Sequence, residues 1–258
     1  MARQRRITIL GSGNVATHIA GGLQAAGCHI TEVCSRSLTN ASRLAESLHD
    51  CRPLDNPSDL ATDSDLYIIA CSDSAIADIA ARMPRVDGIV VHTSGSVPLT
   101  ALAPASSRYG VLYPLQTFSR ESHVDLRKVP FFTEASDQAT LQETDSYASM
   151  LSDLVYHADS RQRTILHIAG VLSCNFVNYL WQLTEETLAP EGYSLDVVRP
   201  LIEATLQKAM DIGPYKAQTG PAVRGDLATI QRHTDILPQD TAEIYRILSE
   251  SIIQSHRK

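Results

Sequence analysis

Apolar and polar positions alternate along the first part of the chain in a pattern that predicts parallel β-strands separated by helices. Short aliphatic and β-branched runs are followed by stretches with helical spacing, as in βαβ units. The run Leu66–Ala70 is apolar throughout, which is typical of a central strand covered on both faces. The other expected strands are the run that ends at Gly11, Ile30–Cys34, Gly88–His92, Gly110–Tyr113, Val129–Thr133 and Leu154–Tyr156; the expected helices are Thr17–Ala26, Asn40–His49, Ser72–Met83 and Gln138–Leu151.

The pattern changes after about Asp159, where strand signals stop and long helical patterns begin. The sequence therefore predicts an α/β domain with a mainly parallel sheet over residues 1–158 and an all-α domain over residues 159–258. The helices expected in the second domain are Thr164–Leu188, Leu195–Ile212, Asp226–Arg232 and Thr241–Gln254, with a loop over Gln218–Gly225.

The first strand runs into a glycine turn that predicts a dinucleotide site. Gly11 allows a sharp turn, Gly13 lets the backbone approach phosphates, and Ala16 lets the following helix pack on the strand. The helix N-terminus offers free N–H groups to an anion. The alternative is a strand–helix turn without a ligand. The residues expected to contact the cofactor here are Gly11, Ser12, Gly13, Asn14 and Val15.

Composition narrows the class of protein. The chain has 258 residues, 43% of them hydrophobic, which is enough for a packed core. The net charge of −7 disfavours a nucleic-acid partner, and the five cysteines contain no C-x-x-C, so no metal site is expected. Without an evident signal peptide or membrane span, we expect a soluble, cytoplasmic protein.

The end of the second expected strand indicates which nucleotide is bound. NAD-binding folds place an acidic residue there for the ribose 2′-hydroxyl, about 20 residues beyond the glycines. This chain has Ser35, Arg36 and Ser37 instead. A guanidinium suits a 2′-phosphate, so the sequence predicts NADP(H); the alternative is that Arg36 is a solvated loop residue.

Small polar residues follow the next two strands at the edge where open α/β sheets bind ligands. Two of them have alternative interpretations. Asp73 suits the cap of the following helix as well as contact with the cofactor, and His92 suits a buried position at a strand end as well as contact with the cofactor. The expected cofactor contacts from these strand ends are Cys71, Ser72, Asp73, His92, Thr93 and Ser94.

These motifs occur in an order that resembles a family. The resemblance is to an uncharacterised group of bacterial NADP oxidoreductases with a Rossmann-like domain followed by the helical domain of unknown function 2520. It spans nearly the whole chain, and the later motifs are the most specific. They are Gly11-x-Gly13-Asn14-Val15-Ala16, Ser35-Arg36-Ser37, His92-Thr93-Ser94-Gly95, Tyr113-Pro114-Leu115-Gln116-Thr117-Phe118, His167 with Asn175, and Thr219-Gly220-Pro221-x-x-Arg224-Gly225-Asp226.

The wider relatives are pyrroline-5-carboxylate reductase, ketopantoate reductase and the 3-hydroxyacid dehydrogenases. The resemblance implies a C-terminal domain like that of 6-phosphogluconate dehydrogenase, a small-molecule substrate held between the nicotinamide and the helical domain, and a homodimer through the helical domain. It names no substrate.

The chain departs from these relatives at the catalytic position. The 3-hydroxyacid dehydrogenases and ketopantoate reductase carry a lysine in the first long helix of the second domain, whereas Thr164–Leu188 contains none. It contains His167 and, eight residues on, Asn175, which an α-helix brings to one side about 12 Å apart along its axis. His167 suits proton donation and Asn175 suits orientation of a substrate, unless both are interdomain hydrogen-bonding residues.

Two further residues are weaker candidates for contact with the substrate. Arg224, in a polar glycine-broken loop, suits a carboxylate, or it pairs with Asp226 to fix the loop. Gln116 belongs to the specific Pro-Leu-Gln-Thr-Phe motif.

The expected function is an NADP(H)-dependent oxidoreductase that transfers hydride to or from a small carbonyl or imine substrate. The alternative is an NADP-binding sensor or interaction protein without turnover, which the missing lysine favours. A deazaflavin is a weaker third option for the hydride carrier.

Overall fold

The computed structural model describes residues 3–119 and 124–257. The chain forms two compact units that divide between Val171 and Leu172. The hydrophobic period changes earlier, near residue 158, where the strands end. The two boundaries differ because the helix that starts at Ser160 contacts the first unit through its first turns, at Leu99 and Glu134.

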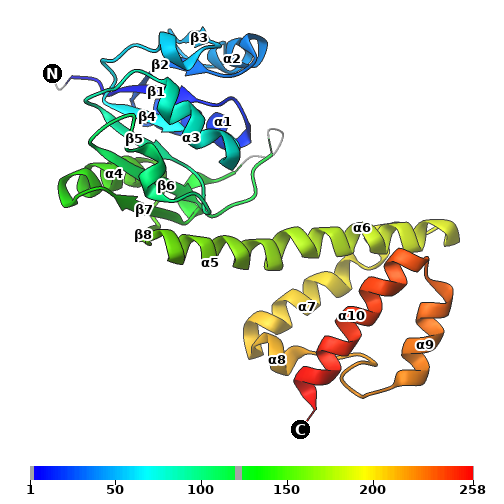
Figure 1. Cartoon of the computed structure of the whole chain (residues 1–258). Helices are drawn as coiled ribbons and strands as arrows, with labels where there is room; N and C mark the ends of the chain where they lie inside the picture. The colour runs from blue at the N-terminus through cyan, green and yellow to red at the C-terminus, as the bar shows by residue number, and fades with distance from the viewer. Residues whose placement is uncertain (1–2, 120–123, 258) are drawn as a thin grey trace. The chain divides into compact units, whose positions relative to one another are not determined.

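The described part of the first unit contains one eight-stranded sheet with the order β3-β2-β1-β4-β5-β6-β7-β8 (Figure 1). The first six strands are parallel and have the order 3-2-1-4-5-6 of a Rossmann fold. The strands are β1 (Arg6–Leu10), β2 (His29–Cys34), β3 (Arg52–Leu54), β4 (Leu66–Ile69), β5 (Ile89–His92), β6 (Tyr109–Pro114), β7 (Phe131–Ala135) and β8 (Val155–His157).

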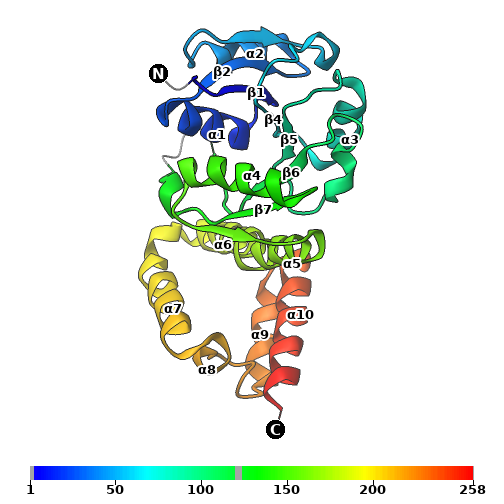
Figure 2. The same cartoon turned by 90° about the vertical axis from the view of Figure 1, so that its left-hand side faces the viewer.

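Helices cover both faces of this sheet, and each face has its own apolar core. The helices α1 (Asn14–Ala25), α2 (Leu38–Ala45) and α4 (Gln138–Leu151) pack on the face that carries Ile7, Ile9 and Ile68. The helix α3 (Asp73–Arg82) packs on the opposite face over Tyr67 and Ile69. Figure 2 shows α1 and α4 on one side of the strands and α3 on the other.

The last two strands reverse direction, and this reversal positions the helix that follows them. β7 is antiparallel to β6, and β8 is parallel to β7. The chain therefore leaves β8 away from the carboxyl edge of the parallel strands. The helix α5 (Ser160–Gly170) brings it back to that edge, where His167 meets Tyr113 at the end of β6.

A buried ion pair fixes the start of α5. Arg163 is fully buried and pairs with Glu134 of β7. Its guanidinium also donates to the carbonyl of Val97 at 2.9 Å, in the loop after β5, and to that of Ala158 at 3.4 Å. A buried charge needs such partners, so β7, this loop and α5 are held together by one side chain.

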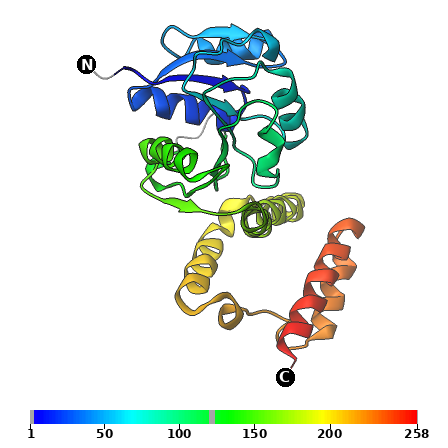
Figure 3. The same ribbon diagram turned by 60° about the vertical axis from the view of Figure 1, so that its left-hand side comes forward.

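The second unit consists of helices only in its described part. They are α6 (Phe176–Leu188), α7 (Arg199–Ile212), α8 (Pro214–Ala217), α9 (Leu227–Ile236) and α10 (Gln239–His256). α9 and α10 lie side by side, and α7 stands apart from them in Figures 2 and 3. Few of its apolar side chains are buried; they are Leu183, Ala222, Ile230 and Ala242.

A π-helical turn, Val171–Asn175, joins α5 to α6 and corrects one sequence expectation. The spacing of His167 and Asn175 by two α-helical turns assumed an unbroken α-helix. A π turn accommodates more residues per turn than an α-helix does, so the single α-helix expected over Thr164–Leu188 is interrupted between these two residues. The two residues also belong to different units.

The same helical segment corrects the expectation that no stretch is long and apolar enough for a membrane span. In the described residues one helix of 32 residues, Ser160–Glu191, passes that test by length and composition, because an 18-residue window within it has a mean hydropathy of 1.2. Core or interface helices of soluble proteins pass the same test, so the finding assigns no membrane location.

The expected fold class is confirmed, including the mainly parallel sheet and the helical C-terminal region. α4 has the predicted bounds, because its apolar spacing and the Asp137 cap are both local signals. The sequence analysis missed β3, a three-residue edge strand that contains Pro53. It also placed the starts of α1 and α2 two to three residues late.

We predict that Glu134→Gln destabilises the protein by about 3 kcal/mol, because it leaves the buried Arg163 charge without its carboxylate. The matched control is Glu143→Gln, which removes an exposed pair with Arg108 and should cost less than about 1 kcal/mol. Urea unfolding followed by circular dichroism measures both, and equal losses would contradict the prediction.

Candidate functional site

A cavity of about 690 Å³ opens at the carboxyl edge of β1, β2 and β4. This is the position where the strand order reverses between β1 and β4, at which open α/β folds bind nucleotides. Its polar lining comes from the turn after β1, the segment after β2 and the start of α3. The predicted residues that line it are Gly11, Ser12, Gly13, Asn14, Val15, Ser35, Arg36, Ser37, Cys71, Ser72, Thr93 and Gln116.

The two glycines of the first turn meet different constraints. Gly11 has φ +126°, and a Cβ there would lie 2.0 Å from the carbonyl oxygen of Ala70, so no other residue fits. Gly13 lines the cavity, and a Cβ there would meet nothing within 4 Å. A side chain at Gly13 would therefore fill cavity space that the backbone leaves open, which is the cradle that a pyrophosphate requires.

The N-terminus of α1 faces the same cavity through Asn14 and Val15. Gly13 occupies the N-cap position and has no side chain to satisfy the first N–H groups of the helix. These donors and the helix dipole favour an anion at this end. Asn14 Nδ2 donates to the carbonyl of Phe118 at 2.8 Å, which ties the segment after β6 to the start of α1.

Arg36 lies on the cavity wall between two hydroxyls that have structural partners. The Ser35 and Ser12 hydroxyls are 2.8 Å apart, and the Ser37 hydroxyl accepts from the N–H of Asn40 at 3.4 Å as the cap of α2. The Arg36 side chain is exposed, and no carboxylate among the described residues is within ion-pair distance of it. Its guanidinium is therefore available to a phosphate.

Sequence analysis missed other charged residues that line this wall. Asp55 follows β3, and Arg82 ends α3, where it pairs with Asp78 at 3.3 Å. Neither is near Arg36 in sequence, so only the fold brings them to the cavity. The presence of Asp55 means that the wall holds a carboxylate as well as guanidinium groups.

Three predicted residues of the strand ends lie outside the cavity lining. His92 is fully buried, and its Nδ1 accepts from the N–H of Ser94 at 3.2 Å. The Ser94 hydroxyl accepts from the N–H groups of Ser96 and Val97. Asp73 is the first residue of α3, and Ser72 occupies the N-cap position. His92 and Ser94 thus shape the turn after β5.

Burial determines the protonation of several groups here. Burial, and secondarily the nearby Arg163 charge, lowers the pKa of His92 to about 3, so its ring is neutral at pH 7. Burial raises the pKa of the Cys34 and Cys71 thiols to about 11, with Asp55 and Asp73 respectively adding to the effect. These two cavity thiols are therefore protonated and poor nucleophiles.

A pair that sequence analysis did not assign lies at the same edge of the sheet. The Tyr113 hydroxyl at the end of β6 is 3.3 Å from His167 Nδ1 on α5. Burial, followed by the field of Asp73, raises the pKa of Tyr113, and Arg163 opposes this effect. The only available signal was the Tyr-Pro-Leu-Gln-Thr-Phe motif, because 54 residues separate the partners in sequence.

The remaining predicted residues belong to the second unit. Asn175 ends the π turn, and Arg224 is exposed in the loop before α9. Asp226 caps α9 by accepting from the N–H of Thr229 at 3.0 Å, and hydrogen bonds from Thr229 lower its pKa. The assignment of Asn175 and Arg224 to a substrate stays a prediction.

Comparison with known proteins agrees with this architecture. The chain is 36% identical to a Bacteroides fragilis protein named a "putative NADP oxidoreductase", over 97% of this chain and 98% of that one, with a TM-score of 0.90. Residues 6–94 match the family described as NADP oxidoreductase, coenzyme F420-dependent, and residues 129–252 match the Domain of unknown function (DUF2520). The chain belongs to this family of NADP oxidoreductases. The predicted family is thus confirmed, and so is the expected cofactor, NADP(H).

More distant structures share the fold. A reductive aminase from Aspergillus terreus in complex with NADPH and ethyl-5-oxohexanoate has 16% identity and a TM-score of 0.73, over 99% of this chain and 95% of that one. A pyrroline-5-carboxylate reductase from Coxiella burnetii has 14% identity and a TM-score of 0.55, over 98% of each chain. A comparison with curated proteins finds no match.

Proposed function

We propose that this protein is an NADP(H)-dependent oxidoreductase that transfers hydride to or from a small carbonyl or imine compound. The observation that carries the proposal is the arrangement at the carboxyl edge of the sheet. The nucleotide cavity is lined by Thr93, and two residues later a Cβ on Gly95 would lie 2.8 Å from Tyr113 Cζ and 2.9 Å from His167 Cβ. The contact between Tyr113 and His167 therefore lies close to a residue that lines the cavity, which supports a role for this pair in proton transfer.

The residues of the cavity divide the binding of NADP(H) among them. The turn of Gly11 and Gly13 and the N-terminus of α1 would hold the pyrophosphate, and Arg36 would bind the 2′-phosphate with the neighbouring serines. Thr93 and Gln116 line the end that would receive the nicotinamide half. When bound, the reduced cofactor supplies a hydride.

In this proposal His167 is the general acid that donates the proton. Its side chain is exposed, so the ring can exchange protons with solvent, and an imidazole serves as a general acid or base. As imidazolium it donates a proton to the oxygen or nitrogen on which negative charge develops during reduction. The relationship to a reductive aminase is compatible with this substrate class, although that similarity reaches only the fold.

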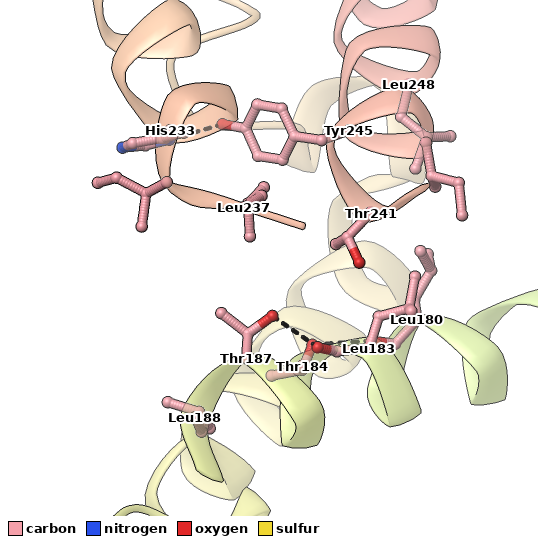
Figure 4. Close-up of a pocket in the computed structure, with 12 residues that line it drawn as sticks. Leu180, Leu183, Thr184, Thr187, Leu188, His233, Leu237, Thr241, Tyr245 and Leu248 are labelled. Carbon is pink, nitrogen blue, oxygen red and sulfur yellow. Dashed lines mark hydrogen bonds between the residues drawn. The ribbon is translucent and has the colours of Figure 1, made fainter. Parts of the chain in front are cut away.

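We also propose that the second unit forms a homodimer. Its large apolar side chains are mostly exposed, for example Leu201, Leu206 and Met210 on α7. A cavity of about 440 Å³ lies between α6, α9 and α10, and its walls are almost entirely apolar (Figure 4). A unit with so few buried side chains lacks a sufficient core of its own, and a second copy of the chain would supply the missing cover.

Arg36→Ala should weaken NADPH binding about 10- to 100-fold and leave NADH binding nearly unchanged, because charge-assisted hydrogen bonds to the 2′-phosphate are lost. The control is Arg43→Ala, an arginine in the last turn of α2 that does not line the cavity. Isothermal calorimetry with both nucleotides measures the effect. Equal losses for NADPH and NADH would remove the 2′-phosphate assignment.

His167→Asn should lower kcat about 100-fold or more and leave NADPH affinity within twofold of wild type, because only proton donation is removed. The assay is NADPH oxidation with a panel of 2-keto acids, 2-ketopantoate-like compounds and cyclic imines. NADPH binding by the wild-type protein without turnover of any compound would favour the sensor over the enzyme.

Leu206→Glu should weaken self-association at least tenfold, because it places a charge in an apolar interface. Gln207→Glu adds the same charge to the next residue and serves as the control. Sedimentation velocity at micromolar concentration should give the mass of two chains for the wild-type protein and for the control. A wild-type mass of one chain would contradict the proposed dimer.

A further inference from the structure

The contact between Tyr113 and His167 joins two elements of the first unit. Tyr113 is only 7% exposed at the end of β6, whereas His167 is exposed on α5. The Tyr113 hydroxyl is 3.3 Å from Nδ1, and the two rings meet edge to face with centroids 6.4 Å apart. A buried, rigid group thus contacts one nitrogen of the imidazole.

The surrounding structure brings the two side chains together. Arg163 lies one helical turn before His167 and anchors α5 to β7 and to the loop after β5. Gly95 lies between the partners, and a Cβ there would be 2.8 Å from Tyr113 Cζ and 2.9 Å from His167 Cβ. Any larger residue at this position would force the two side chains apart, so the pair depends on a glycine at that point.

We infer that Tyr113 is a positioning residue for proton donation by His167: its hydroxyl holds Nδ1 and leaves Nε2 as the nitrogen that donates the proton. This inference rests on the proposed oxidoreductase function. It adds a residue on β6 to a site that otherwise contains residues of the nucleotide cavity and α5.

The proton and electron balance of the step is simple. The reduced nicotinamide would supply the hydride and be left as NADP+; the hydride bonds to the substrate carbon, and the electron pair of the carbon–oxygen or carbon–nitrogen double bond moves to the oxygen or nitrogen. That atom takes the Nε2 proton of the imidazolium, and the ring becomes neutral with its remaining proton on Nδ1. The Nδ1–H donates to the phenol oxygen of Tyr113, and solvent then restores the Nε2 proton.

Tyr113 is suited to this role because it stays neutral. Burial and the Asp73 carboxylate raise the pKa of Tyr113, while the guanidinium of Arg163 on α5 lowers it. A neutral phenol accepts a hydrogen bond from the charged ring without competing for the proton.

The first experiment needs no substrate. The ¹⁵N signals of the His167 ring are recorded by NMR as a function of pH in the wild-type protein, in Tyr113→Phe and in Tyr109→Phe, a matched change on the same strand. Tyr113→Phe should alter the Nδ1 signal and the balance between the two neutral tautomers of the ring, whereas Tyr109→Phe should reproduce the wild type. An Nδ1 signal that is the same in all three proteins would overturn the inference.

The second experiment is a double-mutant cycle with the compound of the panel that is reduced fastest. Tyr113→Phe should lower kcat about 10- to 100-fold and leave KM for NADPH within twofold. In the His167→Asn background the same change should cost less than about twofold. Losses that multiply independently would overturn the inference.

Gly95→Ala tests the geometry while keeping both functional groups. It should reproduce the kinetic effects of Tyr113→Phe with NADPH affinity retained, and full activity would overturn the inference. Failure of the wild-type protein to turn over any compound would overturn the proposed function together with this role. Turnover with unchanged His167 nitrogen signals would overturn the positioning role alone.

Discussion

The arrangement of the site depends on one buried charge. Arg163 has no access to solvent, so its guanidinium must find partners inside the protein. It finds Glu134 on β7 and the carbonyl of Val97 after β5, two segments that the chain would not otherwise bring to the same helix. Because His167 follows one turn later, the interaction that anchors α5 also fixes the height of the imidazole above the end of β6.

The nucleotide cavity depends on a different constraint, the close approach of the backbone of Gly11 to that of Ala70. Gly11 lies so close to the Ala70 carbonyl that β1 and β4 could not end side by side with a larger residue there. Gly13 is free of such contacts and instead leaves space on the cavity side. The same short turn therefore serves both the packing of the sheet and the shape of the ligand site.

Local signals made most of the fold and half of the site predictable from the sequence. The strand, glycine turn and helix of residues 7–25 lie within one segment, and twelve of the predicted contacts line the cavity because strand ends gather at one edge. Asp55 and Arg82 carry no local signal, since each reaches the cavity only through the fold, and the motif that contains Tyr113 does not indicate its partner His167, 54 residues away. The π turn was also beyond reach, because apolar spacing does not distinguish it from an α-helical turn.

The neutral His92 ring has a consequence for the behaviour of the protein in acid. The pKa of His92 is held at about 3 in the folded state. The folded state therefore loses stability relative to the unfolded state as the pH falls from about 6.5 toward 3, because over this range the unfolded chain binds a proton at His92 that the folded chain does not. Protonation would set a second cation beside Arg163, at the turn that leads to Gly95. Acidification would therefore weaken the turn after β5 on which the contact between Tyr113 and His167 depends.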